Sequence, residues 1–285
     1  MPFRIATRPG SSDRENEDFA AATDRTAVLL DGVSGRPGNG CVHGVAWYTR
    51  RLGGLLLAAA DAGSGPAADD GSEPGSPLRE ALAGAVEQAS SLHAETCDLT
   101  RQESPSATAV VVRVHGDRLE YLVLSDSVLV VTGSGGARLF AETRLDDLRA
   151  ELARAPYETE PGTPARVEEE DRRRHEIRAH RNVDGGFWTA GSDPRAADAA
   201  LAGSVPIEGV CGFVAMTDGA SRAVDVFGAH DWDSAAGMAL GRSPRALIDQ
   251  VRSLESADPD GLRFPRGKRS DDATVVTWQP DSGQG

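Results

Sequence analysis

The fold is decided by the stretch Val28–Gly35, which reads Val-Leu-Leu-Asp-Gly-Val-Ser-Gly. An apolar run of this length that is bounded by glycine predicts a buried strand. A carboxylate at the end of a buried strand is costly to desolvate without a partner, so we expect Asp31 to hold a cation or a strong hydrogen-bond donor. Gly32 allows the backbone to approach whatever Asp31 holds.

Two later stretches repeat this pattern of an apolar run that ends in an aspartate. Val214–Gly219 reads Val-Ala-Met-Thr-Asp-Gly, and Leu122–Asp126 reads Leu-Val-Leu-Ser-Asp. Three expected strands therefore each place an aspartate at their carboxyl end. Such a set of carboxylates is typical of a metal site built on a sheet.

Composition and charge restrict the partners of this chain. The 285 residues include 44 acidic and 30 basic side chains, which gives a net charge of −14. This charge disfavours nucleic acid and an acidic membrane surface as partners. The amino terminus lacks an apolar signal region, and the longest apolar-rich stretch, Leu52–Ala60, is too short to span a bilayer. We expect a cytoplasmic protein, and the sequence leaves its oligomeric state open.

The cysteines and histidines show no spacing that is typical of ligands. Cys41, Cys97 and Cys211 are far apart, odd in number and include no Cys-x-x-Cys pair. We therefore expect neither a zinc site nor a disulfide framework, but small apolar side chains in a reducing compartment. The six histidines, including His43 and His93 on expected helices, are expected to be satisfied or exposed.

The apolar periodicity predicts strands and helices that alternate in groups. Expected strands cover residues 3–7, 19–22, 26–31, 107–115, 119–124, 128–132, 137–140, 211–217 and 273–278. Expected helices cover residues 41–60, 78–97, 145–155, 166–181, 193–201, 231–240 and 243–254. The helix 166–181 is highly charged, and we expect its arginines, 172–174 among them, to form a solvated face. Helices in pairs between groups of strands predict one α+β domain.

Acidic residues stand at the ends of four expected strands. They are Glu17-Asp18, Asp31, Asp218 and Asp271-Asp272. Two like charges about 4 Å apart repel by roughly 4 kcal/mol at an effective dielectric constant near 20, so their convergence requires cations between them. Oxygen ligands alone suit Mg²⁺ or Mn²⁺. Two such ions that share a carboxylate can bind a water between them and lower its pKa.

Six motifs resemble, in order, those of the metal-dependent protein phosphatases of the protein phosphatase 2C type. The matching stretches are Asn16-Glu17-Asp18, Val28–Gly35, Ser106–Val110, Ser125-Asp126-Ser127, Thr217-Asp218-Gly219 and Asp271–Val275. Each short motif alone is weak, whereas six in the order of the family are specific.

The resemblance implies a four-layer αββα sandwich, in which two antiparallel sheets lie between helix pairs. It implies a single domain over residues 1–280, with a surface loop at 61–77 and a tail at 281–285. Residues 156–190 fall where the family carries its substrate flap, but they match it poorly.

The resemblance also implies two Mn²⁺ or Mg²⁺ ions, with a third in many bacterial members, and it assigns them the ligands Glu17, Asp31, Gly32, Asp126, Asp218 and Asp271. Asp31 would bridge two ions, and Asp126 would join Asp218 in the third site. Asp18 would act behind the ions through water.

The implied reaction is direct attack of a metal-bound hydroxide on a phosphoserine or phosphothreonine of a protein substrate, without a phosphoenzyme. Arg14 is the candidate for gripping the substrate phosphate, although its spacing is one residue short of the family pattern, and Arg8 is the alternative. In addition, Ser125 replaces the glycine of the Gly-Asp-Ser motif. These departures leave two other functions open, namely a catalytically weak phosphatase-like binding module and a phosphatase of small metabolites.

Overall fold

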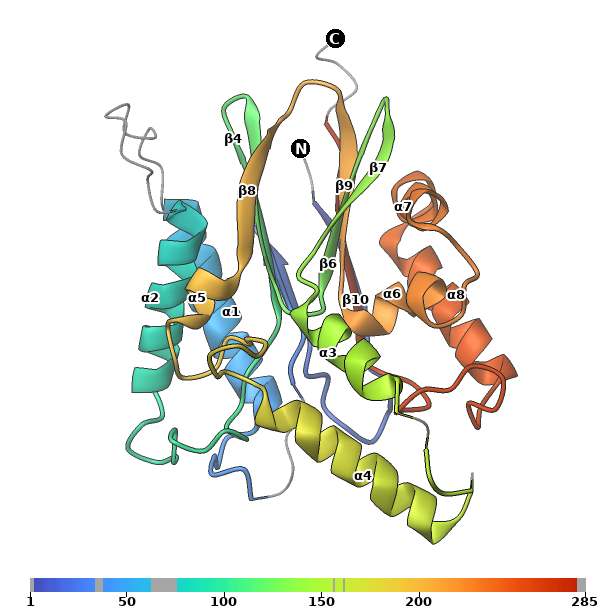
Figure 1. Cartoon of the computed structure of the whole chain (residues 1–285). Coiled ribbons are helices and arrows are strands. Elements are labelled where there is room, and N and C mark those ends of the chain that lie inside the picture. Colours follow the sequence, from blue (N-terminus) through green and yellow to red (C-terminus); the bar gives the residue numbers. More distant parts are fainter. Residues whose placement is uncertain (1–2, 34–37, 63–75, 156, 161, 281–285) are drawn as a thin grey trace.

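Two antiparallel sheets of five strands each form the centre of the molecule in a computed structural model (Figure 1). The structure describes residues 3–33, 38–62, 76–155, 157–160 and 162–280. The first sheet has the order β1 (Arg4–Arg8), β10 (Ala273–Trp278), β9 (Val210–Met216), β6 (Val128–Gly133) and β7 (Gly136–Ala141). The second has the order β2 (Phe19–Ala22), β3 (Thr26–Leu30), β4 (Ala109–His115), β5 (Arg118–Leu124) and β8 (Leu201–Pro206).

Helices cover the outer face of each sheet, so the expected αββα sandwich is confirmed (Figure 1). The second sheet is covered by α1 (Val45–Ala62), α2 (Pro77–Ser91) and the short α5 (Ala196–Ala199). The first is covered by α6 (Asp218–Asp225), α7 (Trp232–Gly241) and α8 (Pro244–Ala257). Two further helices, α3 (Arg144–Ala153) and α4 (Pro164–Ala179), lie across one end of the sandwich.

A third apolar core fills the space between the two sheets. Leu29 and Val110 of the second sheet pack there with Leu129, Phe213 and Trp278 of the first. Because successive side chains of a strand point to opposite faces, a central strand of this sandwich must be apolar on both. This explains why β3 and β10 are buried along their whole length and why both strands could be predicted from the sequence.

The strand register brings four chain segments to the same end of the sandwich. β3 and β5 are both antiparallel to β4, so their carboxyl ends lie at one edge. The turn after β5 leads directly into β6, whose first residue, Val128, pairs with Met216 at the end of β9. Met216 also pairs with Val275 near the start of β10. The residues that follow β3, β5 and β9 and those that precede β10 therefore meet at this end.

Several boundaries differ from the sequence-based expectation. The helix expected at 41–60 begins only at Val45, and the one expected at 78–97 already ends at Ser91. Strand β8 and helix α6 were not predicted. The expected helix start at Ser243, with Pro244 in the first turn, is confirmed, because the Ser243 side chain accepts a hydrogen bond from the Ala246 amide.

Parts of two expectations concern residues that the structure does not describe. Residues 63–75 of the expected surface loop and residues 281–285 of the expected tail lie outside the described ranges. Among the described helices, none combines the length and the apolar character that crossing a membrane requires.

Candidate active site

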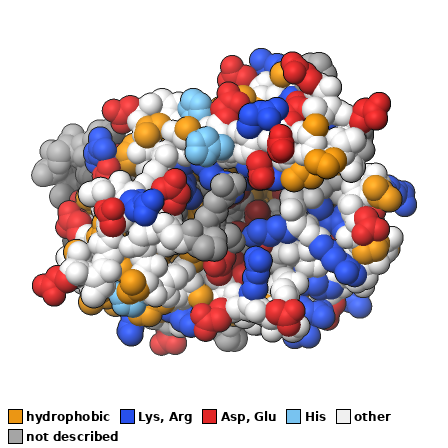
Figure 2. Space-filling view, turned by 90° about the horizontal axis from the view of Figure 1, so that it is seen from below, with side chains coloured by type: hydrophobic (Ala, Val, Ile, Leu, Met, Phe, Trp, Pro, Cys, Tyr) orange, Lys and Arg blue, Asp and Glu red, His pale blue; other side chains and the backbone are white. Residues whose placement is uncertain are grey.

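The end of the sandwich where the four segments meet carries a cavity of about 460 Å³. Asp31 follows β3, Asp126 lies in the turn between β5 and β6, Asp218 opens α6 directly after β9, and Asp271 precedes β10. All four side chains line this cavity, together with Gly32. Figure 2 shows this face hollowed near its centre, with acidic side chains inside the hollow and basic ones beside it.

Asp31 and Asp218 are in direct contact, and both resist ionisation. Burial and repulsion by Asp218, Asp18 and Asp126 raise the pKa of Asp31 well above its usual range. Burial and repulsion by Asp126 and Asp271 raise the pKa of Asp218 to about 6, although a hydrogen bond from Asp31 lowers it. Two carboxyl groups in this arrangement either share a proton or require a cation.

Asp18 lies behind this pair and is 7 % exposed. One of its oxygens, Oδ2, accepts hydrogen bonds from the Thr274 hydroxyl at 2.7 Å and from the Thr217 hydroxyl at 3.1 Å. The other oxygen, Oδ1, is buried and accepts no hydrogen bond from any residue that the structure describes. Burial, opposed by the Thr274 hydrogen bond, raises the pKa of Asp18 to about 8. A buried polar atom without a protein partner indicates a place for a water or an ion.

The glycines that follow Asp31 and Asp218 are required by close packing. A Cβ on Gly32 would lie 2.5 Å from the Val45 side chain and 2.6 Å from the Glu17 carbonyl oxygen. A Cβ on Gly219 would collide with the Asp272 carbonyl oxygen. Neither glycine has a positive φ, so the two Asp-Gly pairs are not left-handed turns. They let the aspartate-bearing segments approach one another.

The neighbouring acids Asp271 and Asp272 have different surroundings. Asp272 accepts hydrogen bonds from the backbone amides of Gly10 at 2.8 Å and Glu17 at 2.7 Å, which fixes the segment before β2. Asp271 lines the cavity and forms ion pairs with Arg222 at 3.2 Å and Lys268 at 2.8 Å. Of the two, Asp271 is the one available to a ligand in the cavity.

Asp126 depends on an unusual backbone conformation at the residue before it. Ser125 is fully buried and has a φ of 65°, in the left-handed region that favours glycine. This is the position at which the sequence motif has glycine, so the substitution costs backbone strain here. The Asp126 carboxylate faces Arg149 of α3 at 3.1 Å.

Glu17 and Arg14 line a neighbouring cavity of about 950 Å³ rather than the one over Asp31 and Asp218. Asp271 and Lys268 line both cavities, so the two are adjacent. Glu17 approaches the cavity over Asp31 and Asp218 through its contact with Gly32. The role expected for Arg14 stays a prediction. Arg8, the alternative, forms an ion pair with Asp249 at 3.1 Å.

Six basic side chains that line the cavity were not among the site residues expected from the sequence. They are Arg149 of α3, Arg174 and Arg178 of α4, and Arg181, Arg222 and Lys268. The expectation that the arginines of residues 166–181 form a solvated face was therefore wrong for Arg174, Arg178 and Arg181. Arg174 and Arg178 are four residues apart, on either side of Ile177, and such spacing places them on one helix face. This four-residue spacing is the sequence feature that could have predicted a shared position for Arg174 and Arg178.

The donor set of the cavity fits divalent cations that prefer oxygen. Four carboxylates, a buried carboxylate oxygen without a partner and raised pKa values describe a site whose charge is not balanced by protein groups alone. Carboxylate and carbonyl oxygens are the ligands that Mg²⁺ and Mn²⁺ prefer. The residues present therefore fit the ions that the sequence motifs imply.

The fold of the chain was compared with those of known proteins. No protein-family model matches the chain, and no curated protein sequence matches it. Several solved structures do match over nearly the whole of both chains. A bacterial serine phosphatase superimposes with a TM-score of 0.63 at 14 % identity, with 100 % of both chains covered. The serine/threonine phosphatase Stp1 from Staphylococcus aureus has a TM-score of 0.60 at 14 % identity, with 98 % of this chain and 95 % of that chain covered.

A third similar structure is PppA of Pseudomonas aeruginosa, with a TM-score of 0.54 at 14 % identity, covering 97 % of this chain and 96 % of that chain. At these identities the likeness establishes the fold. The chain has the fold of bacterial serine/threonine phosphatases, and the resemblance read from six motifs is confirmed at this level.

Proposed function

We propose that this protein is a phosphatase that depends on Mn²⁺ or Mg²⁺ and hydrolyses phosphoserine and phosphothreonine in proteins. The observation that carries the proposal is the convergence of Asp31, Asp126, Asp218 and Asp271 from both sheets on one cavity. The likeness in fold to bacterial serine/threonine phosphatases supports the same reaction. Fold alone does not define function, so the proposal rests on the site.

The ligand assignment in this proposal is the one that the sequence resemblance implies. Asp31, Asp218 and Asp271 would hold one ion, with Asp31 shared with a second that Glu17 and the Gly32 carbonyl complete. Asp126 would serve a third ion, and Asp18 would hold water behind them. When bound, such ions supply a water of lowered pKa as nucleophile and neutralise charge on the phosphate.

The protein itself supplies the orientation of the substrate. Arg149, Arg178 and Lys268 line the cavity together with its aspartates and bring positive charge to it. A phosphate dianion approaching the aspartates is repelled by them, and these cations offset that repulsion. Domain boundaries and a cytoplasmic location, as expected from the sequence, are part of this proposal.

The test is hydrolysis of a phosphothreonine peptide with and without added Mn²⁺. We expect turnover that requires the ion, and we expect Asp218→Asn to lower kcat/KM by at least about 100-fold, since it removes a ligand. The matched control is Asp198→Asn, at an exposed position of α5, which should retain activity. Full turnover in excess chelator, or in Asp218→Asn, would contradict the proposal.

One observation favours a second candidate, a phosphatase-like module that binds a partner and turns over poorly. Arg14, the residue expected to grip the substrate phosphate, lines the neighbouring cavity and not the one over Asp31 and Asp218. This candidate predicts metal binding with negligible hydrolysis of any phosphopeptide. Robust turnover excludes it, and parallel assays on phosphopeptides and small phosphorylated metabolites separate protein substrates from metabolites.

A further inference from the structure

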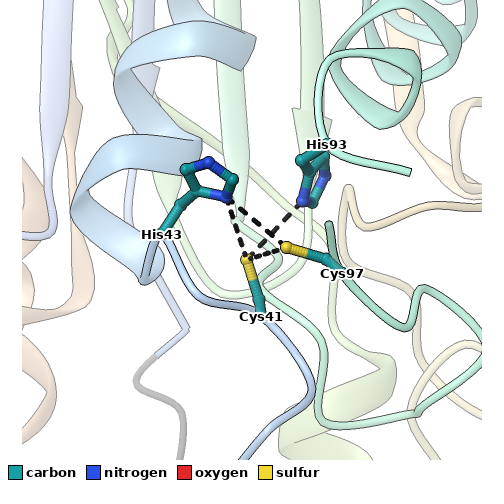
Figure 3. Close-up of side chains that lie close together, drawn as sticks. All are labelled: Cys41, His43, His93 and Cys97. Carbon is teal, nitrogen blue, oxygen red and sulfur yellow. Dashed lines mark hydrogen bonds between the residues drawn. The ribbon is translucent and has the colours of Figure 1, made fainter. Parts of the chain in front are cut away.

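Four side chains that could bind a metal meet at a site separate from the acidic cavity (Figure 3). Cys41 and His43 lie in the segment before α1, and His93 and Cys97 lie in the turns after α2. One ligand atom from each residue lies within 4.8 Å of all the others. The expectation that the cysteines are buried was wrong, and the sequence spacing did not reveal that these four side chains meet. Among the three cysteines of the chain, Cys211 is exposed, while Cys41 and Cys97 are partly buried.

The distances between these atoms approach the edges of a coordination tetrahedron. Cys41 Sγ lies 3.1 Å from Cys97 Sγ and 3.5 Å from His93 Nδ1. His43 Nδ1 lies 3.4 Å from Cys97 Sγ and 4.0 Å from Cys41 Sγ. A zinc ion with bonds of about 2.3 Å to sulfur and about 2.0 Å to nitrogen requires edges of roughly 3.3–3.8 Å. Four of the six edges thus lie within about 0.7 Å of these values, and the other two are no longer than 4.8 Å.

We propose that Cys41, His43, His93 and Cys97 form a structural Zn²⁺ site. Two thiolates and two imidazoles are a ligand set that selects zinc over the oxygen-seeking Mg²⁺ and Mn²⁺. Four protein ligands leave no position for a water or substrate, which is characteristic of a structural rather than a catalytic zinc site. These four residues are distinct from those of the proposed phosphatase site, so the zinc site does not depend on that function.

The surroundings hold the ligands in position without a metal. The Trp47 ring stacks on His43 with centroids 4.2 Å apart and tilts against His93 at 5.3 Å. His93 is 2 % exposed. The Cys97 amide donates to the His93 carbonyl at 2.9 Å, which fixes the turn that carries both residues. Preorganised ligands of this kind lower the entropy lost when an ion binds.

A disulfide between Cys41 and Cys97 is the main alternative reading of the cluster. A disulfide requires sulfur atoms about 2.05 Å apart, against the 3.1 Å found here. It would also leave His43 and His93 without a reason to face the two sulfur atoms. A metal ion uses all four side chains.

The position of the cluster suggests what the ion does. Near the cluster, the Asp98 amide donates to the Gly40 carbonyl at 2.9 Å. Further along the same two segments, the Val33 amide donates to the Ser106 carbonyl at 2.9 Å, directly beside Asp31 and Gly32. The ion would therefore fasten together the two chain segments that lead to the acidic cavity, and fix the start of α1 against the end of α2.

The test begins with the metal content of the full chain, purified without a histidine tag. We expect one zinc per chain by elemental mass spectrometry, retained after dialysis. Replacement by Co²⁺ should give the strong visible absorption of a tetrahedral site and a thiolate-to-cobalt charge-transfer band, which an all-oxygen site does not produce. Removing zinc should lower the melting temperature.

Variants assign the signal to these residues. Cys97→Ser should lose the zinc and the charge-transfer band, whereas Cys211→Ser, the matched control at the exposed third cysteine, should keep both. Cys97→His should restore zinc binding with a weaker charge-transfer band, because one sulfur ligand has become nitrogen. Asp218→Asn should keep the zinc, which separates this site from the proposed phosphatase site.

Three results would overturn the proposal. They are a wild-type chain without zinc that also gives no thiolate–cobalt band, a mass two hydrogens below the reduced chain from a Cys41–Cys97 disulfide, and zinc retained in full by Cys97→Ser. The first two are measured on the wild-type protein, so they hold even if a variant fails to fold.

Discussion

At the scale of single residues, Asp18 shows how a carboxyl group is tuned by what surrounds it. Its Oδ2 accepts two hydroxyl hydrogen bonds, which favour the ionised form, yet burial and the nearby acids outweigh them and raise its pKa to about 8. The unfolded chain ionises the same group near 3.8. Folding in the absence of metal therefore requires this group to take up a proton over the pH range between these values.

This difference predicts how the stability of the protein depends on pH without added Mn²⁺ or Mg²⁺. Between about pH 4 and 8 the folded state binds more protons than the unfolded state, so the free energy of unfolding falls as pH rises. We expect the melting temperature to decrease by several degrees from pH 5 to pH 8. Asp18→Asn, which keeps the shape and cannot ionise, should flatten this decrease. A slope that is unchanged in the variant would show that Asp18 ionises normally.

Ser125 gives a second prediction, about backbone strain. Its φ of 65° is easy for glycine and costs about 1 kcal/mol for other residues. Ser125→Gly and Ser125→Ala both remove the hydroxyl, but only glycine relieves the strain. We expect the glycine variant to be more stable than the alanine variant by about 1 kcal/mol in urea unfolding. Equal stabilities would mean that the segment can relax around Asp126.

At the scale of elements, strands were easier to predict than the ends of helices. Strands such as β3 and β10 are buried on both faces, so their apolar runs are uninterrupted. Strand β8 was missed because its pattern, Leu-Ala-Gly-Ser-Val-Pro, is weakly apolar at the sheet edge. The aspartates at strand ends were predictable for the same reason as the strands, because each charge ends an apolar run.

The sequence-based prediction began the first helix too early and ended the second too late, and this error concealed the cysteine–histidine cluster. Residues 41–44 and 92–97 have helix-compatible spacing, but the structure places them in turns before α1 and after α2. Cys41 and His93 are 52 residues apart and were expected on two different helices, so the sequence did not predict that they lie close together. Their proximity is set by the packing of α1 against α2, which is a tertiary contact that local periodicity does not encode.

Helix α4 supports a prediction about substrate binding. Arg178 lines the acidic cavity, whereas Arg172 lies exposed on the same helix. We expect Arg178→Glu to raise KM for a phosphopeptide by roughly 10–100-fold, because it replaces a charge-assisted contact by repulsion. Arg172→Glu makes the same change in net charge and should alter KM by less than about threefold. If both variants behaved alike, the effect would come from the overall field and not from the cavity.

At the scale of the whole molecule, the acidic cavity lies on the seam between the two sheets. Asp31 and Asp126 follow strands of the second sheet, while Asp218 and Asp271 flank strands of the first. The apolar core between the sheets holds these edges together against the repulsion of the four side chains. Ions bound at the seam would replace that repulsion by attraction, so the stability of the entire sandwich should depend on them.

This dependence gives the last prediction, made for thermal unfolding of the full chain at pH 8. Mn²⁺ at 100 times its dissociation constant stabilises the folded state by about 2.7 kcal/mol, which for a chain of this size raises the melting temperature by roughly 5–10 °C. The rise should be smaller at pH 5, where protons compete for the carboxyl groups whose pKa values are raised. Adding Mn²⁺, rather than a chelator, leaves a zinc ion at Cys41 and Cys97 in place. Asp218→Asn should lose most of the rise and Asp198→Asn none of it, whereas equal rises in both variants would place the Mn²⁺ outside the seam.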